Sequence, residues 1–214
     1  MKIKICGITN LEDARAAIEA GADLLGFNFY RKSARYIEPA TARSIVAQVR
    51  SGARRSQVIG VFVNSSAYEV QSIMREVDLD RAQLHGDESI KLVTQVQGFK
   101  ALRPQSLEEA ENQAKAYAVE GEPALLIDAY RQGEYGGTGQ VGDWSLAARI
   151  AQQQPILLAG GLTPENVAEA IRQVQPWGVD VASGVESAPG KKDVEKMRAF
   201  VAQAKSSADA ARSG

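Results

Sequence analysis

The only cysteine of the chain, Cys6, stands at the end of a short alternating strand, just before a glycine. A thiol at a strand end can act as a base or nucleophile once its pKa is lowered, although a free cysteine is more often a packed core residue. Asp128 closes a second apolar strand, 124–127. Partial burial lets such a carboxyl donate a proton near neutral pH, whereas its ordinary role is that of a turn residue.

Two glycine-containing segments late in the chain suit an anion, 159–166 (Ala-Gly-Gly-Leu-Thr-Pro-Glu-Asn) and 182–186 (Ala-Ser-Gly-Val-Glu). Glycine lets backbone N–H groups approach an anion closely, and Thr163 followed by Pro164 is expected to open a helix whose positive end helps. A single Gly-Gly pair more often makes a tight turn. Two such segments after consecutive strands predict a phosphate site between them.

Three further features lie in expected loops. Arg35 belongs to a segment with three cations, and its planar fork suits a carboxylate, although a loop arginine alone is more often solvated. His85, the only histidine, fits a site role or a structural hydrogen bond equally well. The segment 130–143 contains Gly136-Gly-Thr-Gly139, which predicts either a mobile cover or a long turn.

Composition limits the classes of protein. The chain has 25 basic and 26 acidic residues, so its net charge of -1 does not favour a nucleic-acid or membrane partner. One cysteine excludes an internal disulfide, and one cysteine with one histidine argues against a zinc site. No apolar run has membrane-spanning length, so the cytoplasm is the expected location.

The elements that must position these residues alternate between strand and helix along the whole chain. Thr9, Ser66 and Ser106 each precede a glutamate by three positions, which predicts three capped helix starts, and Gly21 should end the first helix. Strands are expected at Lys2–Cys6, Asp23–Asn28, Gln57–Val63, Arg81–Leu84, Phe99–Leu102, Ala124–Asp128, Ile156–Ala159 and Val179–Ala182.

Eight strand-helix units predict an α/β fold, a single-domain (β/α)8 or TIM barrel, over residues 1–205, with a frayed tail at 206–214. A doubly wound open sheet is the alternative. It is disfavoured because the first strand is followed by Cys6-Gly-Ile-Thr9 instead of a dinucleotide fingerprint.

Seven motifs, in order along nearly the whole chain, resemble the phosphoribosylanthranilate isomerase family of tryptophan biosynthesis. The ordered set is far more specific than any one motif. The motifs are Lys4-Ile-Cys-Gly-Ile-Thr9, Ser33-Ala-Arg-Tyr36, Gln83-Leu-His-Gly-Asp87, Asp128, Gly136-Gly-Thr-Gly-Gln140 with Asp143-Trp144, Leu158-Ala-Gly-Gly-Leu162 and Asp180-Val-Ala-Ser-Gly-Val-Glu186.

The resemblance implies an Amadori rearrangement of N-(5-phosphoribosyl)anthranilate to 1-(2-carboxyphenylamino)-1-deoxyribulose 5-phosphate, without metal or organic cofactor. It implies that Asp128 is the general acid and Cys6 the general base. The thiolate must then coexist with a protonated carboxyl, so we expect nearby positive charge or backbone N–H groups at Cys6 and burial at Asp128. A monomer with a small phosphosugar substrate is expected.

The resemblance also implies that Arg35 contacts the anthranilate carboxylate and that the backbone of the two glycine segments binds the phosphate. One departure is Gly142, where the family often has an aromatic residue, and it puts closure of the segment 130–143 in doubt.

Alternative functions are another phosphosugar barrel, such as an epimerase or the next synthase of the pathway, and a phosphosugar-binding protein without catalysis. The full substrate-binding set comprises Arg35, His85, Gly137, Thr138, Gly160, Gly161, Asp180, Ser183 and Gly184.

Overall fold

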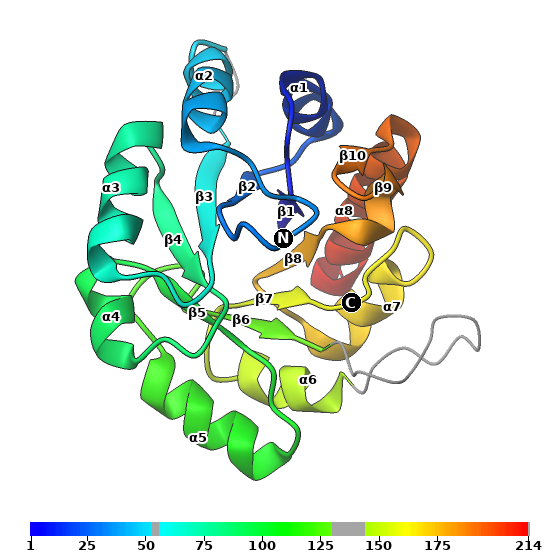
Figure 1. Cartoon of the computed structure of the whole chain (residues 1–214). Coiled ribbons are helices and arrows are strands. Elements are labelled where there is room, and N and C mark those ends of the chain that lie inside the picture. Colours follow the sequence, from blue (N-terminus) through cyan, green and yellow to red (C-terminus); the bar gives the residue numbers. More distant parts are fainter. Residues whose placement is uncertain (53–55, 130–143, 214) are drawn as a thin grey trace.

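The computed structural model describes residues 1–52, 56–129 and 144–213, the side chains of 209–213 excepted. Eight parallel strands form a closed barrel in chain order (Figure 1). The fold is therefore the predicted (β/α)8 barrel, and each strand bound lies within one residue of its predicted position. The strands are β1 (Lys2–Cys6), β2 (Leu24–Asn28), β3 (Gln57–Phe62), β4 (Arg81–Leu84), β5 (Phe99–Leu102), β6 (Leu125–Asp128), β7 (Ile156–Ala159) and β8 (Gly178–Val181).

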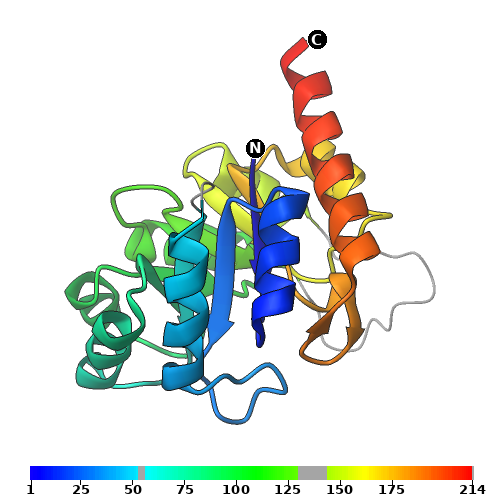
Figure 2. The same ribbon diagram turned by 90° about the horizontal axis from the view of Figure 1, so that it is seen from above.

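Helices follow the strands and surround the barrel (Figures 1 and 2). Their buried faces carry the apolar residues of the sequence pattern, such as Val167, Ala170, Ile171 and Val174 on one helix. The α-helices of the described residues are α1 (Leu11–Ala20), α2 (Pro39–Arg50), α3 (Ala67–Val77), α4 (Ile90–Gln95), α5 (Leu107–Tyr117), α6 (Ser145–Ala151), α7 (Val167–Val174) and α8 (Val194–Ser213).

Two of the three predicted caps are confirmed. The hydroxyls of Ser66 and Ser106 accept hydrogen bonds from backbone N–H groups three residues on. The third prediction, Thr9, is wrong because the next residue, Asn10, caps α1 through its side-chain oxygen. Thr9 instead donates its hydroxyl hydrogen to the carbonyl of Gly190. Asparagine caps helices at least as well as threonine, which explains the shift by one position.

The barrel interior holds both apolar and charged side chains. In β1, Ile3 and Ile5 pack outward in the main core, so alternation points Lys4 and Cys6 inward. An inner apolar cluster fills part of the barrel, but Lys4 is fully buried there as well. Its members are Leu24, Ile59, Phe99, Ala101, Leu126, Leu157 and Ala159.

The connection from β8 to α8 was not predicted in detail. It holds a single 3₁₀ turn, η1 (Ser183–Val185), and a hairpin of β9 (Glu186–Ala188) with β10 (Lys191–Lys192). The last helix runs to Ser213, so the backbone continues as helix where a frayed tail was expected from residue 206. Figure 2 shows the N-terminus and the end of α8 on one side of the barrel, and the hairpin on the other.

Candidate active site

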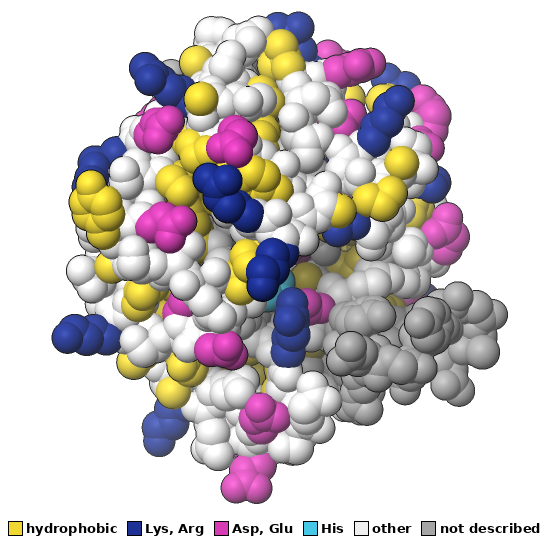
Figure 3. Space-filling model, in the orientation of Figure 1, with side chains coloured by type: hydrophobic (Ala, Val, Ile, Leu, Met, Phe, Trp, Pro, Cys, Tyr) yellow, Lys and Arg dark blue, Asp and Glu magenta, His cyan; other side chains and the backbone are white. Residues whose placement is uncertain are grey.

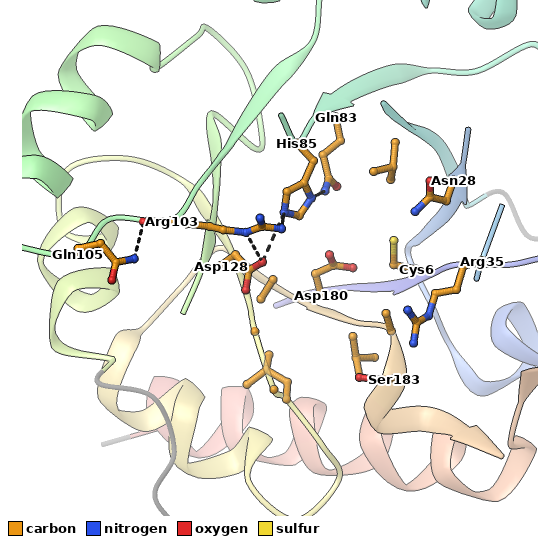
Figure 4. A pocket seen from close by; sticks show the side chains of 17 residues that line it. Cys6, Asn28, Arg35, Gln83, His85, Arg103, Gln105, Asp128, Asp180 and Ser183 are labelled. Atoms are coloured by element: carbon orange, nitrogen blue, oxygen red, sulfur yellow. Dashed lines mark hydrogen bonds and ion pairs between the residues drawn. The ribbon is translucent and has the colours of Figure 1, made fainter. Parts of the chain in front are cut away.

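A cavity of about 900 Å³ opens at the carboxyl ends of the barrel strands. Its volume is typical of small-molecule sites. Figure 3 shows a histidine and several cationic side chains near the centre of this face, and Figure 4 shows the lining residues. Eight predicted site residues line the cavity, namely Cys6, Arg35, His85, Asp128, Gly160, Gly161, Asp180 and Ser183.

Cys6 is half-buried at the end of β1. A Cβ atom added to Gly26, its neighbour on β2, would lie 2.8 Å from the Cys6 sulfur, so only glycine leaves room for the thiol. Burial raises the pKa of Cys6, and the charges of Lys4 and Lys192 lower it without reversing the shift. The predicted positive charge is therefore present, but desolvation outweighs it.

A buried polar cluster lies below the thiol. The Lys4 ammonium donates to Asp180 Oδ1 at 3.1 Å and to Gln83 Oε1 at 2.9 Å. Burial lowers the pKa of Lys4, whereas the carboxylate of Asp180 and the thiolate form of Cys6 raise it. The two anions outweigh burial, so the net pKa of Lys4 lies above its ordinary value. Lys4 therefore brings a fixed positive charge to the floor of the cavity.

The carboxyl of Asp128, at the end of β6, lies across the cavity from Cys6 and contacts Arg103 and His85 (Figure 4). Arg103 Nε donates to Asp128 Oδ2 at 3.0 Å, and His85 Nε2 lies 3.4 Å from the same oxygen. Arg103 Nη2 lies 2.8 Å from His85 Nε2. His85 thus directly neighbours the predicted acid (Figure 4).

Arg35 reaches the cavity from the loop after β2. Its Nε and Nη2 donate to the two carboxylate oxygens of Glu186 at 2.8 and 2.7 Å, and Lys192 Nζ lies 2.9 Å from Glu186 Oε1. Burial raises the pKa of Glu186, whereas hydrogen bonds from Arg35 and Lys192 lower it. Together these bonds outweigh burial, so the net pKa of Glu186 lies below its usual range. A Cβ atom at Gly7 would lie 2.6 Å from Arg35 Cδ, so glycine makes room for the guanidinium stem.

The two glycine segments lie against each other. Gly160 and Gly161 have φ angles of 96° and 66°, which glycine adopts most easily. A Cβ atom at Gly184 would lie 1.9 Å from the carbonyl oxygen of Leu162, so the segments touch through backbone. The predicted helix start at Thr163 is wrong. Asn166 accepts from the Thr163 N–H and closes a turn, which delays α7 to Val167.

Some predicted residues lie outside the described structure. Gly137, Thr138 and Gly142 belong to the segment 130–143. Their predicted roles stay predictions. Gly184 is described but does not line the cavity.

Sequence reasoning missed four charged or polar side chains of the site, Lys4, Gln83, Arg103 and Lys192. Inward alternation in the first and fourth strands was the available signal for Lys4 and Gln83. Arg103 directly follows β5, at the same strand end as the other site residues. Lys192 lies far along the chain in a hairpin, and no pattern indicated it.

A thiol and a carboxyl that face one cavity at the mouth of a (β/α)8 barrel define an α/β-barrel enzyme. The family model described as N-(5'phosphoribosyl)anthranilate (PRA) isomerase matches residues 3–203. The chain therefore belongs to this isomerase family. An N-(5'-phosphoribosyl)anthranilate isomerase of Chlorobium chlorochromatii is 48% identical over 212 residues, which cover 95% of this chain and 96% of the relative.

Solved structures agree. The phosphoribosyl anthranilate isomerase of Thermotoga maritima superimposes with a TM-score of 0.85 at 39% identity, over 96% of this chain and 99% of that chain. A phosphoribosyl anthranilate isomerase in complex with reduced 1-(o-carboxyphenylamino)-1-deoxyribulose 5-phosphate has a TM-score of 0.82 at 37% identity, with the same coverage. Among the described residues, no helix is long and apolar enough to cross a membrane, and no cluster of three acidic, histidine or cysteine side chains suits a metal ion.

Proposed function

We propose that this isomerase converts N-(5-phosphoribosyl)anthranilate to 1-(2-carboxyphenylamino)-1-deoxyribulose 5-phosphate in tryptophan biosynthesis, with Asp128 as general acid and Cys6 as general base. The observation that carries the proposal is that both groups line one cavity together with the two glycine segments. The strands β1 and β6 are separated by β7 and β8 around the barrel. A substrate that lies across the mouth therefore meets one group at each side.

The first step opens the ribose ring. Asp128 gives its proton to the furanose oxygen, the bond between that oxygen and C1 breaks, and the nitrogen lone pair forms a protonated Schiff base at C1. The carboxylate left behind gains stabilisation from Arg103 Nε at 3.0 Å and from the imidazole of His85.

In the second step Cys6 acts as thiolate and removes the proton from C2. The electron pair of that C–H bond forms a C1–C2 double bond and neutralises the iminium nitrogen. The resulting enolamine becomes the ketone when C1 gains a proton and the C2 hydroxyl loses one. Burial raises the pKa of Cys6, and the charges of Lys4 and Lys192 lower it only in part. We propose that the positive charge of the substrate iminium adds to these two charges and lets the Cys6 thiol lose its proton.

The anionic ends of the substrate would be held on opposite sides. Glu186 occupies the Nε and Nη2 edge of Arg35, and no hydrogen bond of the described residues uses Arg35 Nη1, so the Nη1 and Nη2 edge suits the anthranilate carboxylate. The phosphate would bind at the glycine segments. In the described part of the chain, the N–H groups of Gly161, Ser183 and Gly184 donate no hydrogen bond.

The test is turnover of freshly generated phosphoribosylanthranilate, followed by its fluorescence in the presence of a metal chelator. Cys6→Ser should lose nearly all kcat because a hydroxyl is a much weaker base, and Asp128→Asn should do so because an amide cannot donate that proton. We expect losses of at least about 10²-fold in kcat. Wild-type-like turnover of Cys6→Ser would refute its role as base, and a loss confined to KM would make Asp128 a binding residue.

The proposal includes a monomer located in the cytoplasm. Large exposed apolar side chains of the described residues are Tyr68, Ile90 and Leu107, and each lies on a different helix. Three exposed apolar side chains in the part that the structure describes are few for a chain of this size, and exposed apolar residues in such small number do not require a partner.

A further inference from the structure

We propose that Gln83, oriented by the buried Lys4, fixes His85 in the neutral tautomer that carries its proton on Nε2, facing Asp128. The inference adds two positioning residues to the site. Its functional meaning rests on the proposed role of Asp128 as acid, but the tautomer follows from hydrogen-bond geometry alone. Figure 4 shows Gln83 and His85 adjacent at the cavity wall.

Lys4 determines which way the Gln83 amide points. An ammonium group only donates, so the atom of Gln83 that lies 2.9 Å from Lys4 Nζ must be the carbonyl oxygen. Lys4 is fully buried, and Gln83 is 1% exposed. Turning the amide over would face two donors toward each other where water cannot separate them. The amide nitrogen of Gln83 therefore points to His85.

The amide nitrogen then determines the histidine. Gln83 Nε2 lies 2.9 Å from His85 Nδ1. An amide nitrogen is a donor only, so Nδ1 must offer its lone pair. A neutral imidazole has one N–H, which is left on Nε2. That nitrogen lies 3.4 Å from Asp128 Oδ2, on the carboxyl oxygen that Arg103 also contacts.

Arg103 is the competing contact. Its Nη2 lies 2.8 Å from His85 Nε2, and a guanidinium donates only, so this contact favours a lone pair on Nε2. The contacts from Gln83 and Arg103 therefore require opposite tautomers of the neutral imidazole. The Arg103 side chain is 58% exposed, so its Nη2 can turn from His85 toward water while its Nε stays on Asp128, whereas the buried Gln83 amide cannot move. The buried contact decides the tautomer.

The consequence for the reaction is a donor aimed at the acid. A neutral His85 with its proton on Nε2 stabilises the Asp128 carboxylate that remains after ring opening. The opposite tautomer would turn a lone pair toward that carboxylate and repel it. Gln83 and Lys4 would thus act on Asp128 through His85 and not by touching the substrate.

The test is the imidazole ¹⁵N spectrum of protein labelled with ¹⁵N-histidine, recorded at about pH 8.5, above the ordinary histidine pKa of about 6.5. Because the chain has one histidine, every imidazole signal belongs to His85. The wild type should show a protonated Nε2 and a bare Nδ1. A bare Nε2, or an imidazole protonated on both nitrogens, would overturn the proposal without any variant.

The variant is Gln83→Glu, which keeps an oxygen for Lys4 but replaces the amide donor by an acceptor. Its His85 should become protonated on Nδ1, and a spectrum like that of the wild type would remove Gln83 as the determinant. Gln105→Glu adds the same charge to the cavity lining without contacting His85, and it should keep the wild-type tautomer. A changed tautomer in this control would make the effect one of charge and contradict the proposal.

Turnover separates this inference from the proposed function. In Gln83→Glu we expect kcat to fall by about 10- to 100-fold with little change in KM, which is the effect of losing one hydrogen bond to the charged Asp128 carboxylate. The predicted tautomer without isomerase activity in the wild type would refute the function and keep the inference. Full activity with the opposite tautomer would refute the inference alone.

Discussion

Cys6 is subject to opposing influences within one cavity. The ammonium groups of Lys4 and Lys192 favour the thiolate, whereas burial and the Asp180 carboxylate favour the thiol, and the net effect is a raised pKa. The Asp180 charge is itself paired with Lys4 at 3.1 Å. Free enzyme near neutral pH should therefore hold Cys6 mainly as the unreactive thiol.

Alkylation by iodoacetamide measures this directly, because the chain has one cysteine. The reaction rate should rise with pH, with a midpoint above about 8.5, the ordinary value for cysteine, since the raised pKa delays formation of the thiolate. Unfolding in denaturant should return the midpoint to the ordinary value, which serves as the control. A folded-state midpoint below about 8.5 would mean that the cations prevail over burial.

At the scale of elements, the contact between the segments after β7 and β8 depends on Gly184. An alanine there would push its Cβ against the backbone carbonyl of Leu162, so the two segments must separate. We expect Gly184→Ala to raise the KM of the phosphorylated substrate at least about ten-fold, which corresponds to about 1.4 kcal/mol of lost binding.

The matched control is Gly52→Ala, in the turn after α2, where the nearest atom to an added Cβ is Val49 O at 3.3 Å. This variant should keep the wild-type KM. Steady-state kinetics together with thermal unfolding distinguishes a local effect on the proposed phosphate site from general destabilisation. An unchanged KM in a stable Gly184→Ala protein would argue against a phosphate between these segments.

The strands and the helix starts at Ser66 and Ser106 could be predicted from the sequence because they depend on neighbours along the chain. Alternation of apolar residues located β1 within its observed bounds, and serine three positions before glutamate located the caps at Ser66 and Ser106. The prediction failed at Thr9, where two adjacent residues can both cap and only the fold decides which one does.

The partners within the site could not be predicted in the same way. Arg35 and Glu186 are 151 positions apart, and Lys4 and Gln83 are 79 apart, so their pairing depends on which strands close the barrel. A lysine in a strand ordinarily indicates a solvent-facing position. Lys4 is fully buried because Asp180 and Gln83 meet its ammonium inside the barrel.

For the whole molecule, we predict a monomer in solution. Size-exclusion chromatography with light scattering should give a mass near 23.0 kDa, independent of protein concentration. The reason is that only three large apolar side chains, Tyr68, Ile90 and Leu107, are exposed in the described part of the chain. A mass of twice this value at micromolar concentration would contradict the prediction and indicate an interface between two copies.

The described chain ends and the cavity lie at opposite ends of the barrel. Strand β1 starts and helix α8 ends on the side opposite the β9–β10 hairpin, as Figure 2 shows, whereas the cavity is lined by residues at the carboxyl ends of the strands. A fused protein, an affinity tag or a solid support joined to either terminus would therefore leave the mouth open to a diffusing substrate. The barrel is suited to immobilisation, or to coupling with a second catalyst, through either end of its chain.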